Sequence, residues 1–150
     1  MNVAEFTDFM NGLAGVVANP QCRDALQDWT DFAKGELDQM MHQQVSPDGT
    51  PYAPLSRYTS MLKGHSVALF ETGELNSSVK GNRAGHIEQV TNNSARLGTA
   101  HTKNGEPVAA RMQHGSGKIP ARPFIGVNDK MADDAAERIG DDVNQQIDQL

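Results

Sequence analysis

The feature that most constrains the fold is a change in hydrophobic spacing along the chain. Toward both ends, apolar residues recur every three or four positions, which is the spacing of one face of an amphipathic helix. Between the ends, short alternating apolar runs are separated by proline, glycine and asparagine, a pattern typical of strands joined by turns. The sequence therefore predicts an α+β fold, with two N-terminal helices and a C-terminal helix packed on a small, mostly antiparallel β-sheet.

A chain of 150 residues is long enough for one hydrophobic core, so we expect a single domain over residues 1–150. Residues 1–45 should form a helical N-terminal part. Residues 46–128 should form a proline-rich loop followed by the sheet, and residues 129–150 the C-terminal helix.

The helical spacing sets the expected helix limits. The first helix covers residues 3–17 and ends at Asn19-Pro20, because proline cannot continue a helix. The second covers residues 21–44, and its Trp29 is interpreted as a packing residue rather than part of a cofactor site. Asn128 or Asp129 should cap the last helix. Its apolar stripe consists of Met131, Ala135, Ile139, Val143, Ile147 and Leu150.

The middle of the chain is expected to alternate turns with short elements. Residues 45–54 contain three prolines and an Asp-Gly step, which exclude a continuous helix or a central strand. Residues 108–113 fit either a strand or a short helix, and the proline-containing residues 119–125 should lie extended at a sheet edge. A short helix is predicted at 56–62, and strands at 77–79, 86–90 and 94–98.

The net charge of −6 conceals an uneven distribution of charge. Residues 1–46 and residues 129–150 each carry seven acids and two bases, whereas residues 47–128 carry five acids and nine bases. Blocks of opposite sign suit head-to-tail contacts between copies of a chain. The alternative is a set of solvated helices flanking an ordinary sheet, and the sequence does not decide between the two.

No membrane segment or export signal is expected. The chain has no apolar run of about 18 residues, and its N-terminus is acidic where a signal peptide is basic. The single cysteine, Cys22, excludes an intramolecular disulfide and a cysteine-based zinc cluster, and we interpret it as a small buried apolar group. The protein is therefore expected in the cytoplasm.

Catalysis is not expected either. The five histidines lack the spacing of a His-Glu-x-x-His motif, and the chain contains no G-x-S-x-G elbow, P-loop or dinucleotide fingerprint. We therefore predict no catalytic residue, no metal site and no cofactor.

Three motifs follow one another in the middle of the chain. The first is SPDGTPYAPL at residues 46–55, and the second is LFETGELNSS at residues 69–78. The third is MQHG at residues 112–115 followed by IPARPFIG at residues 119–126. In this order and spacing they resemble the phage virion morphogenesis family, the tail-completion proteins of contractile-tailed and Mu-like phages. The second motif is also similar to the broader tail-completion and neck group.

This resemblance implies a structural protein that completes the tail or the head–tail junction of a phage or prophage. Such a protein would be a virion component assembled in the bacterial host cytoplasm. The expected partners are other copies of the chain in a closed ring, with six copies matching the usual tail symmetry. Tail-tube, tail-terminator or head-connector proteins are the other expected partners, and no membrane is involved.

The motif residues are expected to form turns and subunit contacts. Pro120 and Pro123 should hold Arg122 on a rigid extended segment, where its guanidinium could bind a carboxylate of a neighbouring copy. The alternative is an intrachain salt bridge to Glu71, Glu74 or the last helix. On the first interpretation, Arg122→Glu should leave the monomer folded and abolish assembly. The candidate subunit-interface residues are Thr72, Gly73, Gln113, Gly115, Arg122, Pro123 and Phe124.

A DNA-contacting head–tail connector component is the alternative function. The basic residues of the middle region could line a channel and contact phosphates without reading sequence. A pI near 5.2 and an aromatic content of 5% argue against DNA binding by the free protein, so non-specific contact is expected only within an assembled ring. These basic residues are Arg57, Lys63, Lys80, Arg83, Arg96, Lys103, Arg111, Lys118 and Arg122.

Overall fold

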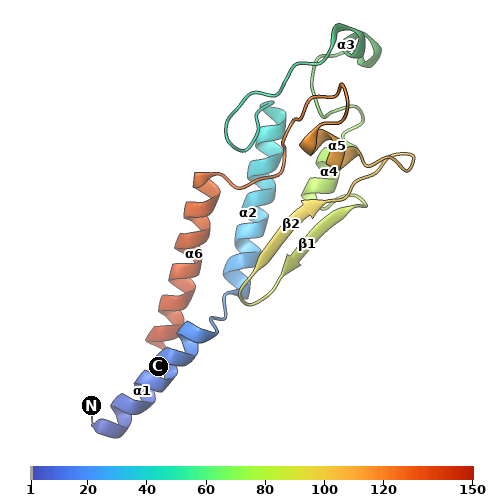
Figure 1. Ribbon diagram of the computed structural model, residues 1–150. Coiled ribbons are helices and arrows are strands. Elements are labelled where there is room, and N and C mark those ends of the chain that lie inside the picture. The colour runs from blue at the N-terminus through green and yellow to red at the C-terminus, as the bar shows by residue number, and fades with distance from the viewer. Residues whose placement is uncertain (1) are drawn as a thin grey trace.

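Two long antiparallel helices form the axis of the molecule. In the computed structural model, which describes residues 2–150, α2 (Arg23–His42) and α6 (Asp129–Asp148) lie side by side and run in opposite directions (Figure 1). The indole Nε1 of Trp29 donates a hydrogen bond of 2.7 Å to the carbonyl oxygen of Met131, which joins the two helices. The side chain of Asn128 accepts a hydrogen bond from the N–H of Met131, so the predicted helix cap is confirmed.

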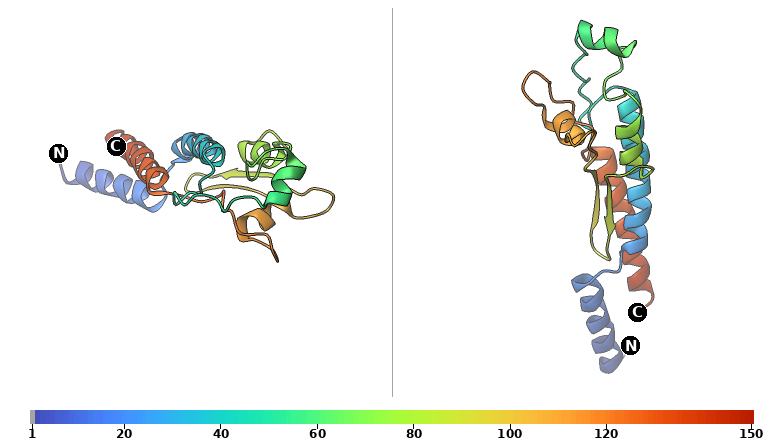
Figure 2. Two further views of the ribbon diagram at one scale, coloured as in Figure 1. Left: turned by 90° about the horizontal axis from the view of Figure 1, so that it is seen from above. Right: turned by 90° about the vertical axis from the view of Figure 1, so that its right-hand side faces the viewer.

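The sheet is a single antiparallel hairpin of β1 (His86–Val90) and β2 (Ala95–Thr99), with His86 opposite Thr99 and Val90 opposite Ala95. Helices α2 and α4 (Glu74–Lys80) cover one face of the hairpin, and α5 (Val108–His114) lies on its other side (Figure 2). The α+β class is confirmed, as are the two strands near residues 86–90 and 94–98.

The strand predicted at residues 77–79 is wrong, because these residues belong to α4. Leu75, Ser78 and Val79 are buried, and their spacing of three and four places them on one helix face. Gly73 precedes the helix at φ +78°, in the left-handed region that glycine enters without strain. Residues 77–79 are therefore one part of a helix, and a segment of three residues is too short to distinguish the helical period from that of a strand.

The hydrophobic core lies where α2, α4 and α6 meet the segment that contains Phe124. Cys22 is buried, as expected. Trp29 packs against the core from α2, which agrees with its interpretation as a packing residue. The largest fully buried apolar side chains are Leu37, Met41, Val79, Phe124 and Met131.

The structure also decides the ambiguous middle segments. Residues 108–113 are helical, in α5, and the short helix predicted at 56–62 is α3 (Arg57–Lys63), capped by Ser56. Residues 119–125 are extended but lie at no sheet edge, contrary to the prediction. The segment is not helical, as its prolines predict. Its main chain is bound by the side chain of Gln113 in α5 and not by a neighbouring strand.

Helix α1 (Val3–Ala18) and helix α3 lie at opposite ends of the molecule (Figures 1 and 2). Helix α1 packs against the C-terminal end of α6, where Leu150 lies over Gly12, and none of its residues is buried. The helix ends at Ala18 with Asn19 as its C-cap, so it stops where the Asn19-Pro20 step predicts.

Candidate assembly site

The guanidinium of Arg122 ties together the two proline-rich segments. Its Nε donates to the carbonyl oxygen of Ala53 at 2.6 Å, and its second terminal nitrogen donates to that of Pro54 at 2.9 Å. The Arg122 N–H also donates to the carbonyl oxygen of Met112, in α5. Only 5% of Arg122 is exposed, and this burial lowers its pKa. The side chain therefore closes the fold of its own chain.

This placement differs from both sequence-based interpretations of Arg122. The carboxylates named as intrachain alternatives bind other bases: Glu71 pairs with Lys103, and Glu74 pairs with Arg83. The partners of Arg122 are main-chain carbonyls, which carry no sequence signal. A subunit contact by the guanidinium would need it to leave these carbonyls.

The side chain of Gln113 forms hydrogen bonds with the main chain of the segment after Arg122, as a neighbouring β-strand would do in a sheet. Its side-chain oxygen accepts hydrogen bonds from the N–H groups of Phe124 and Ile125 at 3.0 and 3.1 Å. Its amide nitrogen donates to the carbonyl oxygen of Ile125 at 2.9 Å. One glutamine thus satisfies three main-chain groups that would otherwise lack partners. Phe124 is held by these bonds with 2% of its surface exposed.

Gly115 permits the close approach that these contacts require. Its backbone lies at φ +76° and ψ 165°, a region open essentially only to glycine. A Cβ at this position would lie 2.9 Å from both the Ala121 nitrogen and the Ile119 oxygen. Gly115 therefore occupies a backbone position of close approach that suits glycine alone, as its place in the motif predicts.

Gly115→Ala is expected to destabilise the fold by about 2–4 kcal/mol, because it combines backbone strain with a main-chain clash. Urea unfolding followed by circular dichroism measures this loss. Gly117→Ala is the matched control, since Gly117 also has positive φ but no atom lies within 4 Å of the place that a Cβ would take there. A cost of about 1 kcal/mol is expected for the control. Equal losses in the two variants would refute the role of the close contact.

The remaining candidate interface residues lie at or near the surface. Thr72 and Pro123 are exposed, and Gly73 is half-buried before α4. Thr72 and Gly73 line a small groove with Val108 and Met112 of α5. Helix α5 therefore connects both groups of motif residues. Their contact with another subunit stays a prediction, strongest for Thr72 and Pro123.

Most of the basic residues in the middle region are engaged within the chain. Lys80, Arg83, Lys103 and Arg111 form ion pairs with acidic residues, and Lys63 donates to a main-chain carbonyl. With Arg122 buried, the bases of this region that form no ion pair and no hydrogen bond within residues 2–150 are Arg57, Arg96 and Lys118.

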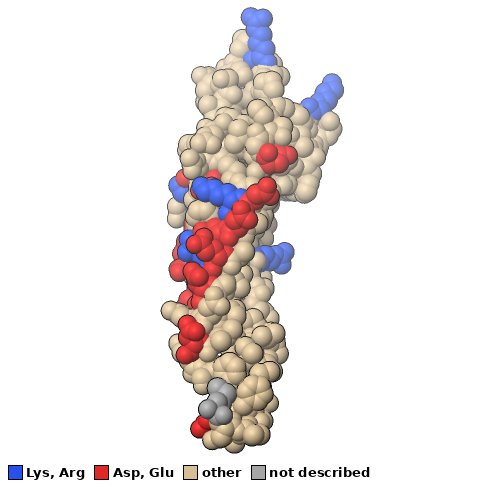
Figure 3. Space-filling view, turned by 90° about the vertical axis from the view of Figure 1, so that its left-hand side faces the viewer, with Lys and Arg blue, Asp and Glu red and all other residues tan. Residues whose placement is uncertain are grey.

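The acidic residues of α6, in contrast, gather on one outer face (Figure 3). In the described part of the chain, Lys130 pairs with Glu36 and Arg138 pairs with Asp134. The other α6 carboxylates form no ion pair there. We call them the acidic face: Asp129, Asp133, Glu137, Asp141, Asp142 and Asp148.

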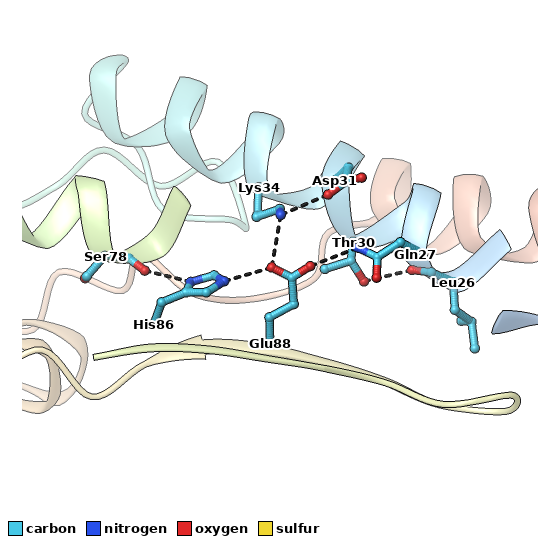
Figure 4. Close-up of polar contacts among 8 residues, drawn as sticks. All are labelled: Leu26, Gln27, Thr30, Asp31, Lys34, Ser78, His86 and Glu88. Carbon is cyan, nitrogen blue, oxygen red and sulfur yellow. Dashed lines mark hydrogen bonds and ion pairs between the residues drawn. The ribbon is translucent and has the colours of Figure 1, made fainter. Parts of the chain in front are cut away.

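A polar cluster between the hairpin and α2 was not found from the sequence (Figure 4). Glu88 accepts hydrogen bonds from Gln27 and Lys34 at 2.9 and 3.0 Å and lies 2.8 Å from the Nε2 of His86. The other ring nitrogen of His86 lies 2.8 Å from the carbonyl oxygen of Ser78. The hydrogen bond to His86, with those from Gln27 and Lys34, lowers the pKa of Glu88 to about 2.

The His-x-Glu alternation was the available signal, because it places both side chains on one face of a strand. The cluster joins strand β1 to helices α2 and α4, so it fastens the hairpin to the helical layer. Among residues 2–150, no three His, Cys, Asp or Glu side chains are grouped so that they could hold a metal ion. No helix in this range has the length and apolar character needed to cross a membrane.

The motif residues thus hold their own chain together, and charged side chains of both signs remain unpaired on different elements of the described chain, where they are free to meet complementary charges of another molecule. The chain belongs to the phage virion morphogenesis family, whose family model matches residues 5–148. Searches of curated proteins and of solved structures find no match. Family membership thus assigns the protein a role in building phage virions.

Proposed function

We propose that the protein is a tail-completion or neck subunit that acts structurally at the head–tail junction or the tail end. Its expected assembly is a closed ring of identical copies, six in number, built in the host cytoplasm. Family membership supports the assembly role. The observation that carries the finer proposal is that the acidic face lies on α6, whereas the unpaired bases Arg57, Arg96 and Lys118 lie on other elements.

This separation suits a ring because a ring needs two different surfaces that fit each other. In a head-to-tail interface, the surface that one copy presents differs from the one it receives, and the contact repeats until the ring closes. The acidic face lies on α6. Arg96 lies on β2 and Lys118 in the loop after α5, on other elements of the fold. Complementary charges on these surfaces would set the register of the contact and accelerate encounter.

The same observations favour a structural role over catalysis. The motif residues Gln113, Gly115 and Arg122 bind or accommodate the main chain. The polar cluster around Glu88 is occupied by its own hydrogen bonds. DNA contact within the ring is the weaker alternative, because only three of the nine bases of the middle region remain without an internal partner among the described residues.

Reversing two charges of the acidic face, with Asp133→Lys and Asp141→Lys in one variant, is expected to weaken self-association at low salt by about tenfold or more. Sedimentation velocity over a concentration series measures the association. The difference from the wild-type protein should shrink at high salt, because salt screens exposed charges. Asp31→Lys, a reversal on α2 outside the acidic face and outside the candidate interface residues, should leave association unchanged. Equal effects of the two variants would argue against the charged interface.

The biological role is tested by deleting the gene from the phage or prophage that encodes it. Electron microscopy of the lysate should then show filled heads and tails that remain unjoined, or tails of abnormal length or end structure. A plasmid copy of the wild-type gene is the control and should restore infectious particles. Normal virions in the deletion lysate would refute the proposed role.

A further inference from the structure

Helix α1 carries more apolar surface than its own chain covers. Phe9, Gly12, Leu13 and Val16 are partly buried and form one stripe, with Gly12 beneath Leu150 at the end of α6. A second apolar stripe lies beside it and faces solvent. Its members are Val3, Phe6, Met10 and Val17, with exposed fractions of 83%, 53%, 44% and 69%. We call it the open stripe.

The spacing of the open stripe is that of a helix that binds in a groove. Val3, Phe6 and Met10 stand at positions i, i+3 and i+7, which anchor an amphipathic helix in an apolar groove. A helix that packs on only one side needs a single apolar stripe. The second stripe of α1 therefore indicates a partner outside the chain.

A groove of suitable character lies on the outer face of the hairpin. It has a volume of about 560 Å³ and is bounded by β2, by α5 and by the segment that Gln113 holds. Ile87, Leu97, Ala110 and Ile125 contribute apolar lining, and Arg96 and His114 also line it. Gly98 leaves the floor open, since no atom lies within 4 Å of a Cβ at this position.

We propose that the open stripe of α1 docks into this groove of a neighbouring copy. The inference rests on the proposed ring and names its subunit contact. Helix α1 carries two carboxylates and no base, which disfavours an anionic lipid surface as the partner of the open stripe, whereas the apolar lining of the groove matches the apolar side chains of the stripe. Docking within one chain is disfavoured because α1 projects from the end of the molecule and would have to leave its contact with α6 (Figure 1).

Two variants test the contact from its two sides. Phe6→Asp places a charge on the open stripe, and Gly98→Ile fills part of the groove from a strand position where no atom lies within 4 Å of the place that a Cβ would take. Each should weaken self-association by at least about tenfold without lowering the urea midpoint of the monomer. Asn11→Asp adds the same charge to the polar side of α1 and should have no effect. Association as tight as that of the wild-type protein in both variants would overturn the docking but not the ring.

Disulfide trapping identifies the neighbour directly. Phe6→Cys protein is mixed with Ala110→Cys protein under mild oxidation, and free thiols are alkylated before denaturation. A covalent dimer that requires both proteins is the expected result. Dimers of Phe6→Cys alone, or cross-links to Met61→Cys on α3, would overturn the assignment, as would an intrachain link in the double variant. A wild-type protein that is monomeric under all conditions would overturn both this contact and the ring.

Discussion

Arg122→Ala is expected to destabilise the protein by about 3–5 kcal/mol. The substitution removes two charge-assisted hydrogen bonds from the buried guanidinium and leaves the carbonyls of Ala53 and Pro54 without their donor. It also separates the two proline-rich segments that the guanidinium joins. Equilibrium urea unfolding measures the loss. Since a domain of this kind is stable by only about 5–15 kcal/mol, this loss is a large share of its free energy of unfolding, and the urea midpoint should fall accordingly.

Two further substitutions separate the geometry of Arg122 from its charge. Arg122→Lys keeps the charge but has no planar fork to reach both carbonyls, so about half of the loss is expected. Arg57→Ala removes an exposed arginine that forms no ion pair in the described part of the chain, and should change stability by less than about 0.5 kcal/mol. If Arg122→Ala were as stable as Arg57→Ala, the hydrogen bonds of Arg122 to Ala53 and Pro54 would not stabilise the fold as claimed. The burial also revises the expectation for Arg122→Glu, which should now impair folding before assembly.

Glu88→Gln is expected to cost about 2–3 kcal/mol at pH 7 and to remove much of the acid sensitivity of the fold. The pKa of Glu88 is lowered from 4.5 to about 2, so the folded state favours the carboxylate. Its contribution, on the order of 3 kcal/mol, is fully present above about pH 4.5 and is lost as the pH falls toward 2. The free energies of unfolding of the wild-type protein and of Glu88→Gln should therefore converge near pH 2.

Urea unfolding of both proteins between pH 2 and pH 7 tests this dependence. Glu71→Gln is the matched control, because Glu71 is an exposed carboxylate paired with a single lysine. Its unfolding curve should follow that of the wild-type protein across the range. A constant difference between the wild-type protein and Glu88→Gln at all pH values would show that the carboxylate is not the stabilising species.

Local spacing predicted the elements with a long or strongly marked pattern. Helix α6 could be predicted from the helical spacing of the apolar residues between Met131 and Leu150 and from the capping side chain of Asn128. Residues 77–79 were too few for the period to distinguish a strand from a helix. The positive φ of Gly73 and the burial of Leu75 and Val79, four positions apart, identify this segment as a helix, and both are visible only in the folded chain.

The candidate site was harder to predict because its contacts use the main chain. The prolines around Arg122 predict an extended segment, which the structure shows, but nothing in the sequence marks the carbonyls of Ala53 and Pro54 as the partners of Arg122. Those carbonyls lie 69 and 68 positions away, respectively. The division of charge was visible in the sequence, whereas the number of bases already paired within the chain depends on tertiary contacts.

These contacts also explain how the chain can both fold and assemble. The motif residues fasten the proline-rich segments and α5 to the core. The acidic face and the open stripe of α1 remain exposed on the isolated subunit. In the proposed ring, folding and assembly would use different residues, so variants of the two groups should separate the two properties.

The most direct test of the central claim is the mass of the purified protein by light scattering at low and high salt. If the protein forms a ring, one closed species is expected at low salt, with a mass that is a multiple of the 16.2 kDa subunit. At high salt it should dissociate at higher protein concentrations than at low salt, because part of its interface is charged. A monomer at both salt concentrations, even in concentrated solution, would contradict self-assembly through the acidic face and α1.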